Sequence, residues 1–369
     1  MPRFSRRSFL HLSVAASAAA AFQVMTEPML AAAARRRPHA KDAVLIDSNE
    51  NPLGPCQAAR DAISAIIPQG GRYSDNLTDE LVSAFAQSEG LAPEYIYCTA
   101  GSTPPLCLSV LAFTSPQKSY VTADPCFETG MMMAAVAGAR VVKVPLTKTY
   151  AHDVKAMLAA GPDAGVFYIC NPNNPTGTLT SHSDIEYLVA NKPKDSIILI
   201  DEAYIHLCDA PSTLDLVKAG KDVIVLRTFS KVYGMAGLRC GFVIARPELL
   251  EKVVARGGQN FMPTTAVAGA TASLKDPTLV VERRRINAGI RQQTFQWLDR
   301  NGYSYIPSES NCFMLDTKRP GKEVRDAVAK ENVLIGRVWP VMPTYVRITV
   351  GTQEEMERFQ VAFQKVMKG

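Results

Sequence analysis

Short and almost uninterrupted apolar runs occupy the middle of the chain, and they constrain its fold more than any other feature. Helix-length stretches separate these runs, which cover residues 119–122, 140–144, 165–169, 197–200, 223–226 and 242–244. Strands of this kind are typical of a mostly parallel sheet that is covered on both faces. In such sheets ligands bind beyond the carboxyl ends of the strands. The polar residues directly after each run are therefore the first candidates for a functional site.

The pattern changes after residue 275. A long helix is predicted over 277–301, with short strands near 303–307, 312–315, 333–336 and 345–350 and helices near 321–331 and 353–367. This mixture indicates a smaller α+β domain. We therefore predict an α/β fold with a large domain (71–275), whose mostly parallel sheet is sandwiched by helices, and a small C-terminal α+β domain (276–369). Residues 42–70 are predicted to form an N-terminal arm and a segment of the small domain.

Residues 1–41 have the order of an export signal: a basic start, an apolar run at 10–22 and an alanine cluster at 31–34. The run is too short for a membrane-spanning helix, which needs about 20 apolar residues. The paired Arg6 and Arg7, followed by Ser-Phe-Leu, resemble a twin-arginine signal. A frayed, alanine-rich helix is the alternative. We expect a leader, a periplasmic or secreted enzyme, and no stable membrane span after leader removal.

The net charge of +5 belongs to this leader. Residues 1–41 hold seven basic side chains against one acidic side chain, so residues 42–369 carry −1. No basic stripe interleaved with aromatic residues remains, and a nucleic-acid partner is therefore not expected. The eight cysteines form no CxxC pair and have no histidine nearby in a ligand spacing, so no metal site is predicted and free thiols are expected.

The strongest local motif surrounds Lys231. Thr228 and Ser230 flank the lysine after an apolar run, and Arg239 lies eight residues beyond it. A lysine amine with a lowered pKa forms Schiff bases with aldehydes, while hydroxyls and a guanidinium suit a phosphate. The combination suggests pyridoxal phosphate (PLP). Taken alone, Lys231 would more simply be a solvated surface charge.

Two other strand ends carry polar residues that suit this cofactor. Asp201 ends the run 197–200, and PLP needs an anion at its ring nitrogen to act as an electron sink. Tyr204 and Asn174 offer donors to the ring oxygen. The simpler alternatives are a helix cap for Asp201 and a plain Asn-Pro turn around Asn174.

Two weaker segments are consistent with the same cofactor. Ser102 and Thr103 offer hydroxyls and backbone N–H groups at a predicted helix start, where anions bind. Phe127 follows a strand and presents a ring that can stack on a flat cofactor.

Together these motifs resemble fold-type I PLP enzymes, and among them the histidinol-phosphate aminotransferase-like branch of the class I and II aminotransferases. The resemblance covers about residues 44–365. It includes the segment Asp47-Ser-Asn-Glu-Asn-Pro-Leu-Gly-Pro, the segment Arg72-Tyr73-Ser74-Asp75 and the closing strand 346–352.

The resemblance implies a role for each matching residue. Lys231 would bind the PLP aldehyde and move a proton. The implied cofactor-binding residues are Asp201 at the ring nitrogen, Tyr204 and Asn174 at the ring oxygen, Phe127 stacked on the ring, Ser102, Thr103, Thr228, Ser230 and Arg239 at the phosphate, and Tyr73 at the phosphate of a neighbouring subunit in a homodimer.

Three residues are implied at the substrate. Arg347 would bind the substrate α-carboxylate or a phosphate end, Asn51 lies in the matching N-terminal segment, and Arg337 is a candidate for a distal acidic group. Alternation in strand 345–350 places Arg347 opposite Val346 and Ile348. A solvated edge-strand arginine is the alternative for Arg347, and a surface arginine is the alternative for Arg337. Residues 101–104 (Gly-Ser-Thr-Pro) and Ser74 depart from the usual branch motifs, as does a phenylalanine at 127 in place of tyrosine.

The resemblance implies an aminotransferase that moves an amino group between an amino acid, or an amino-alcohol phosphate, and a 2-oxo acid. Histidinol phosphate is an alternative substrate. Another PLP reaction on this fold (elimination, racemisation or decarboxylation) is a second alternative, because the fold does not select the bond that breaks. A non-catalytic binding protein is the third.

Overall fold

The computed structural model describes residues 40–73, 75–257 and 261–369. Most of the predicted leader lies outside the described residues. Contacts divide the chain at residue 41, and the fold below concerns the unit Asp42–Gly369. Among the described residues, no helix is both long and apolar enough to cross a membrane.

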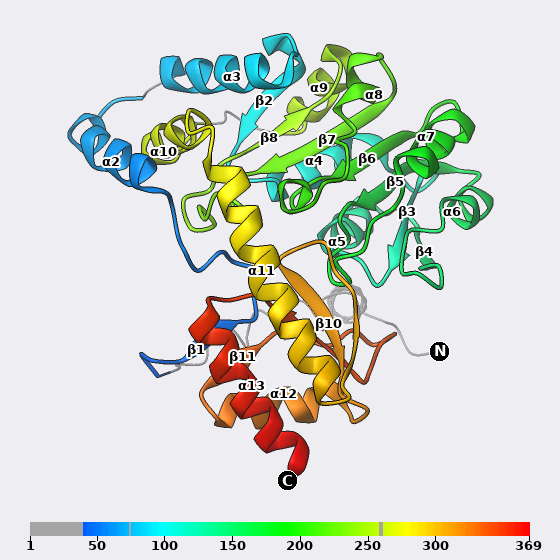
Figure 1. Ribbon diagram of the computed structural model, residues 1–369. Coiled ribbons are helices and arrows are strands. Elements are labelled where there is room, and N and C mark those ends of the chain that lie inside the picture. The colour runs from blue at the N-terminus through cyan, green and yellow to red at the C-terminus, as the bar shows by residue number, and fades with distance from the viewer. Residues whose placement is uncertain (1–39, 74, 258–260) are drawn as a thin grey trace, which may run out of the picture. The chain divides into compact units, whose positions relative to one another are not determined.

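A sheet of seven strands forms the centre of this unit (Figure 1). In spatial order the strands are β2 (Ile96–Thr99), β8 (Gly241–Ile244), β7 (Val223–Thr228), β6 (Ile197–Asp201), β5 (Ala164–Cys170), β3 (Ser119–Asp124) and β4 (Val141–Pro145). All neighbours pair in parallel except β8, which is antiparallel to both β2 and β7. Every residue of β5, β6 and β7 is buried, so helices cover both faces. This confirms the predicted α/β fold with a mostly parallel sheet.

The helices of this part follow the strands along the chain. They are α2 (Gln57–Ile66), α3 (Asp75–Glu89), α4 (Thr103–Phe113), α5 (Thr129–Val136), α6 (Val154–Ala160), α7 (His182–Asn191), α8 (Leu214–Lys218), α9 (Pro247–Val254) and α10 (Thr264–Leu274), with short 3-10 turns η1 (Ile67–Gln69), η2 (Pro93–Tyr95) and η3 (Ile205–Leu207). Side-chain caps fix some of the starts; Ser181, for example, accepts a hydrogen bond from the backbone of Asp184 at the start of α7.

The 22-residue helix α11 (Leu279–Arg300) leads from the large sheet to two smaller sheets (Figure 1). One has the order β12 (Tyr345–Thr349), β10 (Cys312–Asp316), β9 (Ser304–Ile306), all antiparallel. The other pairs β1 (Val44–Ile46) in parallel with β11 (Val333–Ile335). Helices α12 (Gly321–Lys330) and α13 (Gln353–Lys368) pack beside them, and a capping box at Thr352 and Glu355 begins α13.

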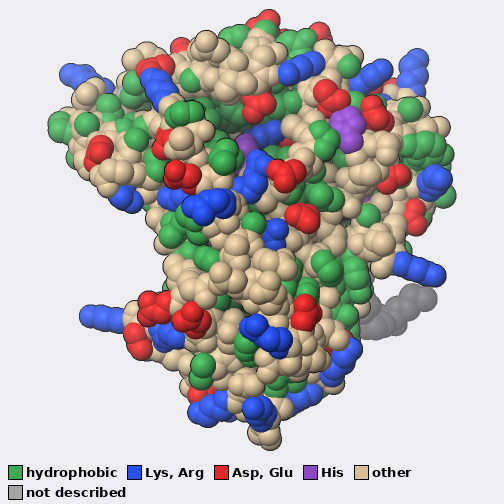
Figure 2. Space-filling model, in the orientation of Figure 1, with side chains coloured by type: hydrophobic (Ala, Val, Ile, Leu, Met, Phe, Trp, Pro, Cys, Tyr) green, Lys and Arg blue, Asp and Glu red, His purple; other side chains and the backbone are tan. Residues whose placement is uncertain are grey.

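Three apolar clusters form among the described residues. The largest surrounds the seven-stranded sheet, the second contains side chains of β1, β10, β11, β12, α12 and α13, and a small third cluster holds Ile306, Met314, Trp339 and Met342. On the face drawn in Figure 2, basic and acidic side chains are interspersed, in keeping with the near-neutral charge of residues 42–369. The eight cysteines are all free thiols, and all but Cys107 are buried.

Candidate active site

Strand ends bring the predicted residues to one edge of the large sheet. In the register, Cys170 lies beside Asp201, and Thr99 and Thr228 both pair with Gly241. Asn174 and Lys231 follow in the loops directly after β5 and β7. Because β8 is antiparallel, its amino end reaches the edge where its neighbours end. The carboxyl edge therefore collects residues that are more than 130 positions apart in the sequence, from Thr99 to Gly241.

Lys231 lies at the centre of this edge. Its Nζ donates to the backbone oxygen of Asn49 at 2.9 Å and lies 5.5 Å from the ring centre of Tyr204. Removal from water and the nearby positive charge of Arg347 lower the pKa of Lys231 to about 8. A larger fraction of neutral amine is therefore present near neutral pH than for an ordinary lysine, as a nucleophilic amine requires. The alternative of a solvated surface lysine does not describe this side chain.

Asp201 ends β6 as a buried carboxyl group. It accepts hydrogen bonds from the Tyr168 hydroxyl and the Ala203 backbone N–H, both at 3.1 Å. Burial raises the pKa of Asp201 to about 6, and the two hydrogen bonds oppose that shift. A cation placed beside the carboxyl would favour its charged form. The geometry suits an anion held for a cationic partner rather than a solvent-exposed helix cap.

A cradle of donors lies at the ends of β2 and β7. The Thr228 hydroxyl donates to Ser230 Oγ at 2.8 Å, and Arg239 Nη1 donates to the same Oγ at 3.2 Å. Arg239 Nη2 donates to the backbone oxygen of Ala100 at 3.1 Å. A Cβ at Gly101 would lie 2.2 Å from Arg239 Nη2, and Gly101 has φ +86°. The guanidinium can therefore occupy this position only because residue 101 has no side chain.

Ser102 and Thr103 begin α4 directly beyond Gly101. Ser102 is the N-cap residue and makes no side-chain cap hydrogen bond. Pro104 and Pro105 carry no N–H, so the backbone N–H groups at the amino end of this 11-residue helix are those of Ser102 and Thr103, where the partial positive charge of the helix lies. The cradle thus combines a guanidinium, hydroxyls and a helix N-terminus, which is a donor set for a phosphate.

Arg347 enters the site from the small sheet. It is 5 % exposed, so it is not a solvated edge-strand arginine. Its Nη1 donates to Asn174 Oδ1 at 2.9 Å, and Nη2 donates to the backbone oxygen of Asp47 at 2.6 Å. The donor end of the Asn174 amide is therefore turned away from Arg347. Gly336 allows this packing, because a Cβ there would lie 2.6 Å from the Arg347 backbone oxygen.

Tyr204 is buried beside Lys231 and contacts the strap, which is the segment of residues 49–53. Its hydroxyl accepts a hydrogen bond from Asn49 Nδ2 at 3.1 Å. Asn49 also accepts from the Thr349 hydroxyl on β12 at 3.0 Å. Burial raises the pKa of Tyr204, so its hydroxyl stays protonated and is a donor to any oxygen placed in the site.

The other predicted residues lie around this centre. Phe127 follows β3 and packs on the large core, only partly buried. Asn51 Nδ2 donates to the Val232 backbone oxygen at 3.0 Å. This bond connects the strap to the lysine loop, which is the loop after β7 that carries Lys231. Tyr73 is 79 % exposed, and its ring lies 4.7 Å from that of Phe261. Within the single chain, Tyr73 is therefore outside the cluster around Lys231.

Arg337 makes an ion pair that no local sequence pattern predicts. Its guanidinium pairs with the carboxylate of Glu128, the residue after Phe127, and lies 4.4 Å from the ring centre of Trp339. Arg347 lies 5.6 Å from the same ring centre. Arg337 is therefore close to the substrate candidate Arg347, and its guanidinium already binds the Glu128 carboxylate.

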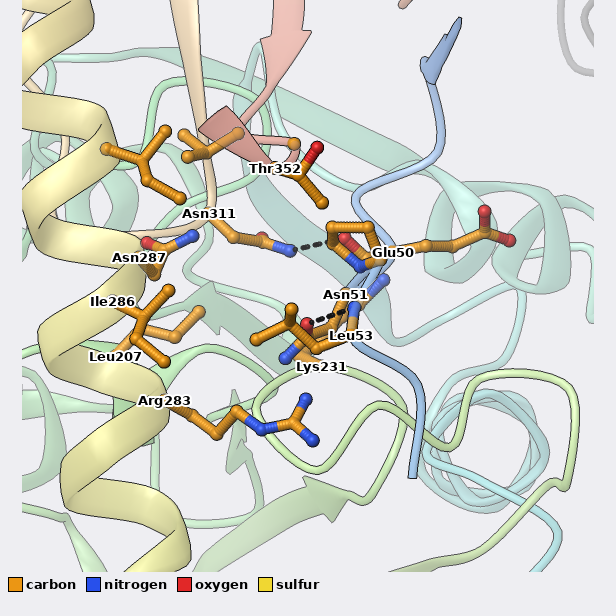
Figure 3. A pocket seen from close by; sticks show the side chains of 14 residues that line it. Glu50, Asn51, Leu53, Leu207, Lys231, Arg283, Ile286, Asn287, Asn311 and Thr352 are labelled. Atoms are coloured by element: carbon orange, nitrogen blue, oxygen red, sulfur yellow. Dashed lines mark hydrogen bonds between the residues drawn. The ribbon is translucent and has the colours of Figure 1, made fainter. Parts of the chain in front are cut away.

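A cavity of about 30 Å³ opens beside Lys231, between α11 and the strap (Figure 3). Asn311 Nδ2 donates to the Asn49 and Glu50 backbone oxygens at 3.0 and 3.4 Å and so holds the strap in place. Arg283 and Asn287 of α11 point toward the same space.

Sequence reasoning missed Asn49, Tyr168, Glu128, Trp339 and Asn311. Tyr168 could have been noticed as a polar tip within an otherwise apolar run, since a buried tyrosine hydroxyl needs a partner. The other four act through contacts with distant segments and have no local signal.

The residues present fit PLP. A phosphate donor set lies at one end and a buried carboxylate lies at the other, with a lysine of lowered pKa near both. PLP offers a phosphate, a ring nitrogen that binds a proton and an aldehyde, which match these three features in turn.

Comparison with known proteins agrees with this fit. Residues 41–363 match the model of the family Aminotransferase class I and II. The histidinol-phosphate aminotransferase of Moorella thermoacetica is 32% identical over 334 residues, which are 89% of this chain and 86% of that protein. The enzyme of the same name from Halalkalibacterium halodurans is 33% identical over 333 residues, 88% of this chain and 89% of its own.

One similar solved structure contains the cofactor PLP. The histidinol-phosphate aminotransferase of Sinorhizobium meliloti, in complex with pyridoxal-5'-phosphate, superimposes with a TM-score of 0.79 at 25% identity, covering 88% of this chain and 90% of that one. This chain therefore belongs to the class I and II aminotransferases and is a PLP-dependent enzyme that transfers amino groups.

Proposed function

We propose that the enzyme moves the amino group of an α-amino acid to a 2-oxo acid, with Arg347 as the binding group for the α-carboxylate of both. One observation carries the proposal: the buried Arg347 guanidinium bonds to Asn174 beside the reactive lysine. A planar guanidinium presents parallel donors that match a carboxylate. Because both substrates of such an exchange carry an α-carboxylate, one site serves both.

The cofactor-binding roles are proposed from the donor set. Asp201 holds the protonated ring nitrogen, and Tyr204 and Asn174 donate to the ring oxygen. Phe127 packs on the ring face, and the phosphate is bound by Ser230, Arg239, Ser102, Thr103 and, more remotely, Thr228. When bound, PLP supplies a ring that takes up the electron pair released at the substrate Cα. Lys231 Nζ would carry a proton to and from that carbon.

The strap supports these roles. Asn311 and Asn51 hold residues 49–53 against the lysine loop, and Asn49 receives the Lys231 amine on its backbone oxygen. This arrangement keeps the amine close to the reacting carbon while the strap and α11 limit the entry of water. Asn51 then acts on the substrate through the strap rather than by direct contact.

The decisive experiment follows the cofactor spectrum. The purified enzyme should show the absorbance band of lysine-bound PLP, and Lys231→Ala should lack it, whereas the surface variant Lys221→Ala should retain it. Adding an amino acid without a 2-oxo acid should convert the cofactor to its amine form in a one-to-one ratio. Product release without that conversion would instead support an elimination, racemisation or decarboxylation.

Histidinol phosphate is a second candidate amino donor. The names of the relatives favour it, since enzymes more than 30% identical over most of the chain are histidinol-phosphate aminotransferases. This substrate has a phosphate ester in place of an α-carboxylate, and Arg347 would then bind the phosphate. A comparison of kcat/KM for histidinol phosphate and for α-amino acids separates the two candidates.

We further propose a homodimer. Tyr73 and Phe261 form an exposed aromatic pair, with exposures of 79 % and 50 %, and exposed aromatic clusters favour burial against a partner. In this proposal Tyr73 reaches the phosphate of the neighbouring subunit. Sedimentation analysis of the holoenzyme tests the dimer, and Tyr73→Phe should weaken cofactor affinity without loss of the dimer. A monomeric holoenzyme would contradict the proposal.

Export by the twin-arginine route is the last part of the proposal. It is supported by the order of Arg6-Arg7, the apolar run and the alanine cluster in residues 1–41. A Lys-Lys replacement of the arginine pair should hold the enzyme in the cytoplasm, with its cofactor bound. Unchanged periplasmic activity in that variant would refute the twin-arginine route.

A further inference from the structure

The Glu128–Arg337 ion pair lies beside the ring of Trp339, which the proposed substrate residue Arg347 also approaches. Arg337 and Arg347 both approach the ring of Trp339, at 4.4 and 5.6 Å from its centre. The backbone N–H of Arg347 also donates to the Arg337 backbone oxygen at 3.3 Å. An amino acid bound through its α-carboxylate at Arg347 therefore has Arg337 within reach of its side chain.

Glu128 comes to this place from the other side of the site. It follows Phe127, the residue proposed to pack on the cofactor ring, and its carboxylate binds the Arg337 guanidinium. The Arg337 and Glu128 side chains are 23% and 19% exposed. Because the pair is mostly removed from water, the attraction between its charges is only weakly screened. The remaining exposure lets a ligand contact it.

Trp339 fixes the arginine end of the pair. The indole is 1 % exposed and packs with Ile306, Met314 and Met342, with Tyr150 and Tyr345 at the margin of the cluster. A guanidinium over an indole face gains cation–π energy and loses freedom to move. Arg337 therefore stays near Glu128 instead of turning to follow a ligand.

The charge of the pair decides which side chains the site accepts. A distal phosphate or carboxylate must displace Glu128 from Arg337, and the displaced carboxylate then lies beside the new anion. Like charges in a partly desolvated site repel strongly. An uncharged side chain leaves the pair intact and meets no such penalty.

We propose that Glu128 is a specificity-determining residue, which neutralises Arg337 and restricts the enzyme to amino donors with uncharged side chains. This proposal rests on the proposed function and names its substrate class. It also separates this enzyme from a dicarboxylate aminotransferase, since an arginine without this carboxylate partner would attract a distal anion. Glu128 acts by repelling the wrong substrate as well as by holding Arg337.

Three unreactive five-carbon ligands test the proposal on the holoenzyme. Pentanoate has one carboxylate, glutarate adds a distal carboxylate, and 5-aminopentanoate adds a distal ammonium. Their Kd values are measured calorimetrically for the wild type, Glu128→Gln, Arg337→Gln and the double variant. Glu331→Gln is the matched control, because it removes a carboxylate from the remote, partly exposed ion pair with Lys365.

Glu128→Gln should tighten glutarate binding by about 10- to 100-fold, the range for a hydrogen bond to a charged group, and leave pentanoate unchanged. The double variant should lose this gain. Arg337→Gln should favour 5-aminopentanoate, because Glu128 is then uncompensated. The Arg337→Gln measurement does not depend on Glu128→Gln, so it still tests the proposal if Glu128→Gln folds poorly. In the wild type and the Glu331→Gln control, glutarate should bind no better than pentanoate.

The proposal is overturned if the ratio of the glutarate and pentanoate Kd values is the same in the wild type and in Glu128→Gln, or if Arg337→Gln does not gain 5-aminopentanoate. Activity adds a second readout: Glu128→Gln should raise kcat/KM for donors with a distal carboxylate or phosphate relative to uncharged donors. An absence of transamination with every donor would contradict the proposed function, but the binding ratios would still test the role of Glu128.

Discussion

Arg347 Nη1 and Asn174 Oδ1 form a 2.9 Å hydrogen bond that joins the three-stranded sheet to the loop after β5. The same guanidinium donates to the backbone oxygen of Asp47 through Nη2. A residue from near the C-terminus therefore completes a site whose other walls come from the large sheet and the N-terminal strap.

Arg347→Lys tests the carboxylate contact. A lysine keeps the charge but loses the planar pair of donors, so kcat/KM for α-amino acids should fall by about 10- to 150-fold. The absorbance band of bound PLP should persist, because the cofactor is held by other residues. A donor amine without a carboxylate is the internal control, since its turnover should change little. An unchanged kcat/KM for amino acids would remove Arg347 from the substrate site.

The pH dependence of cofactor binding tests the lysine. The folded-state pKa of Lys231 is lowered to about 8, below its ordinary value of 10.5, so the neutral amine accumulates as the pH rises through about 8. Incorporation of PLP into the apoenzyme, followed by absorbance, should accelerate over that interval. Arg347→Gln removes one of the charges that lower the pKa and should move the midpoint to higher pH. A midpoint near 10.5 in the wild type would contradict the assignment.

Gly101→Ala tests the phosphate cradle. The new Cβ would lie 2.2 Å from Arg239 Nη2, so the guanidinium must leave its position, and PLP affinity should fall by about 10- to 100-fold. Gly220→Ala is a matched control: its φ of +69° carries a similar backbone penalty, but no atom lies within 4 Å of the new Cβ. Both variants should lose some stability, and only Gly101→Ala should release the cofactor. Equal PLP affinities would show that Arg239 does not bind the phosphate.

Glu202→Gln tests the buried ion pair between Glu202 and Arg227, which lies next to Asp201 in the chain. The Glu202 carboxylate is fully buried and pairs with Arg227 at 2.7 Å, while Thr213 donates to its other oxygen through both its backbone N–H and its hydroxyl. Breaking a buried ion pair typically costs about 3–5 kcal/mol of unfolding free energy. Urea unfolding should report that loss, whereas the exposed Glu248→Gln should leave the midpoint unchanged. A midpoint shift no larger than that of Glu248→Gln would show that the pair contributes little.

Local patterns predicted the large sheet, and they also predicted that several proposed site residues would follow its strands. Lys231, Asp201 and Asn174 follow apolar runs, and the carboxyl ends of parallel strands necessarily meet at one edge. The prediction of a distal role for Arg337 identified the right neighbourhood but could not include Glu128, which lies 209 residues away in the sequence. Charge pairs between separate segments leave no periodicity in either segment. The hydrogen bond from Lys231 to the Asn49 backbone oxygen could not be predicted either, because every residue has such an oxygen.

The pairing of β1 with β11 has a consequence for synthesis of the chain. Val44 pairs with Val333, so the strand adjoining the predicted leader has no partner until most of the polypeptide has been made. At about 5–20 residues per second, the ribosome needs roughly 15 to 60 s to cover that interval. During this time, the arm that carries the strap is tethered but unfolded, and Lys231 lacks the residues that later enclose it. Loading of the cofactor is therefore expected to follow the synthesis of β11, when the arm gains its partner strand.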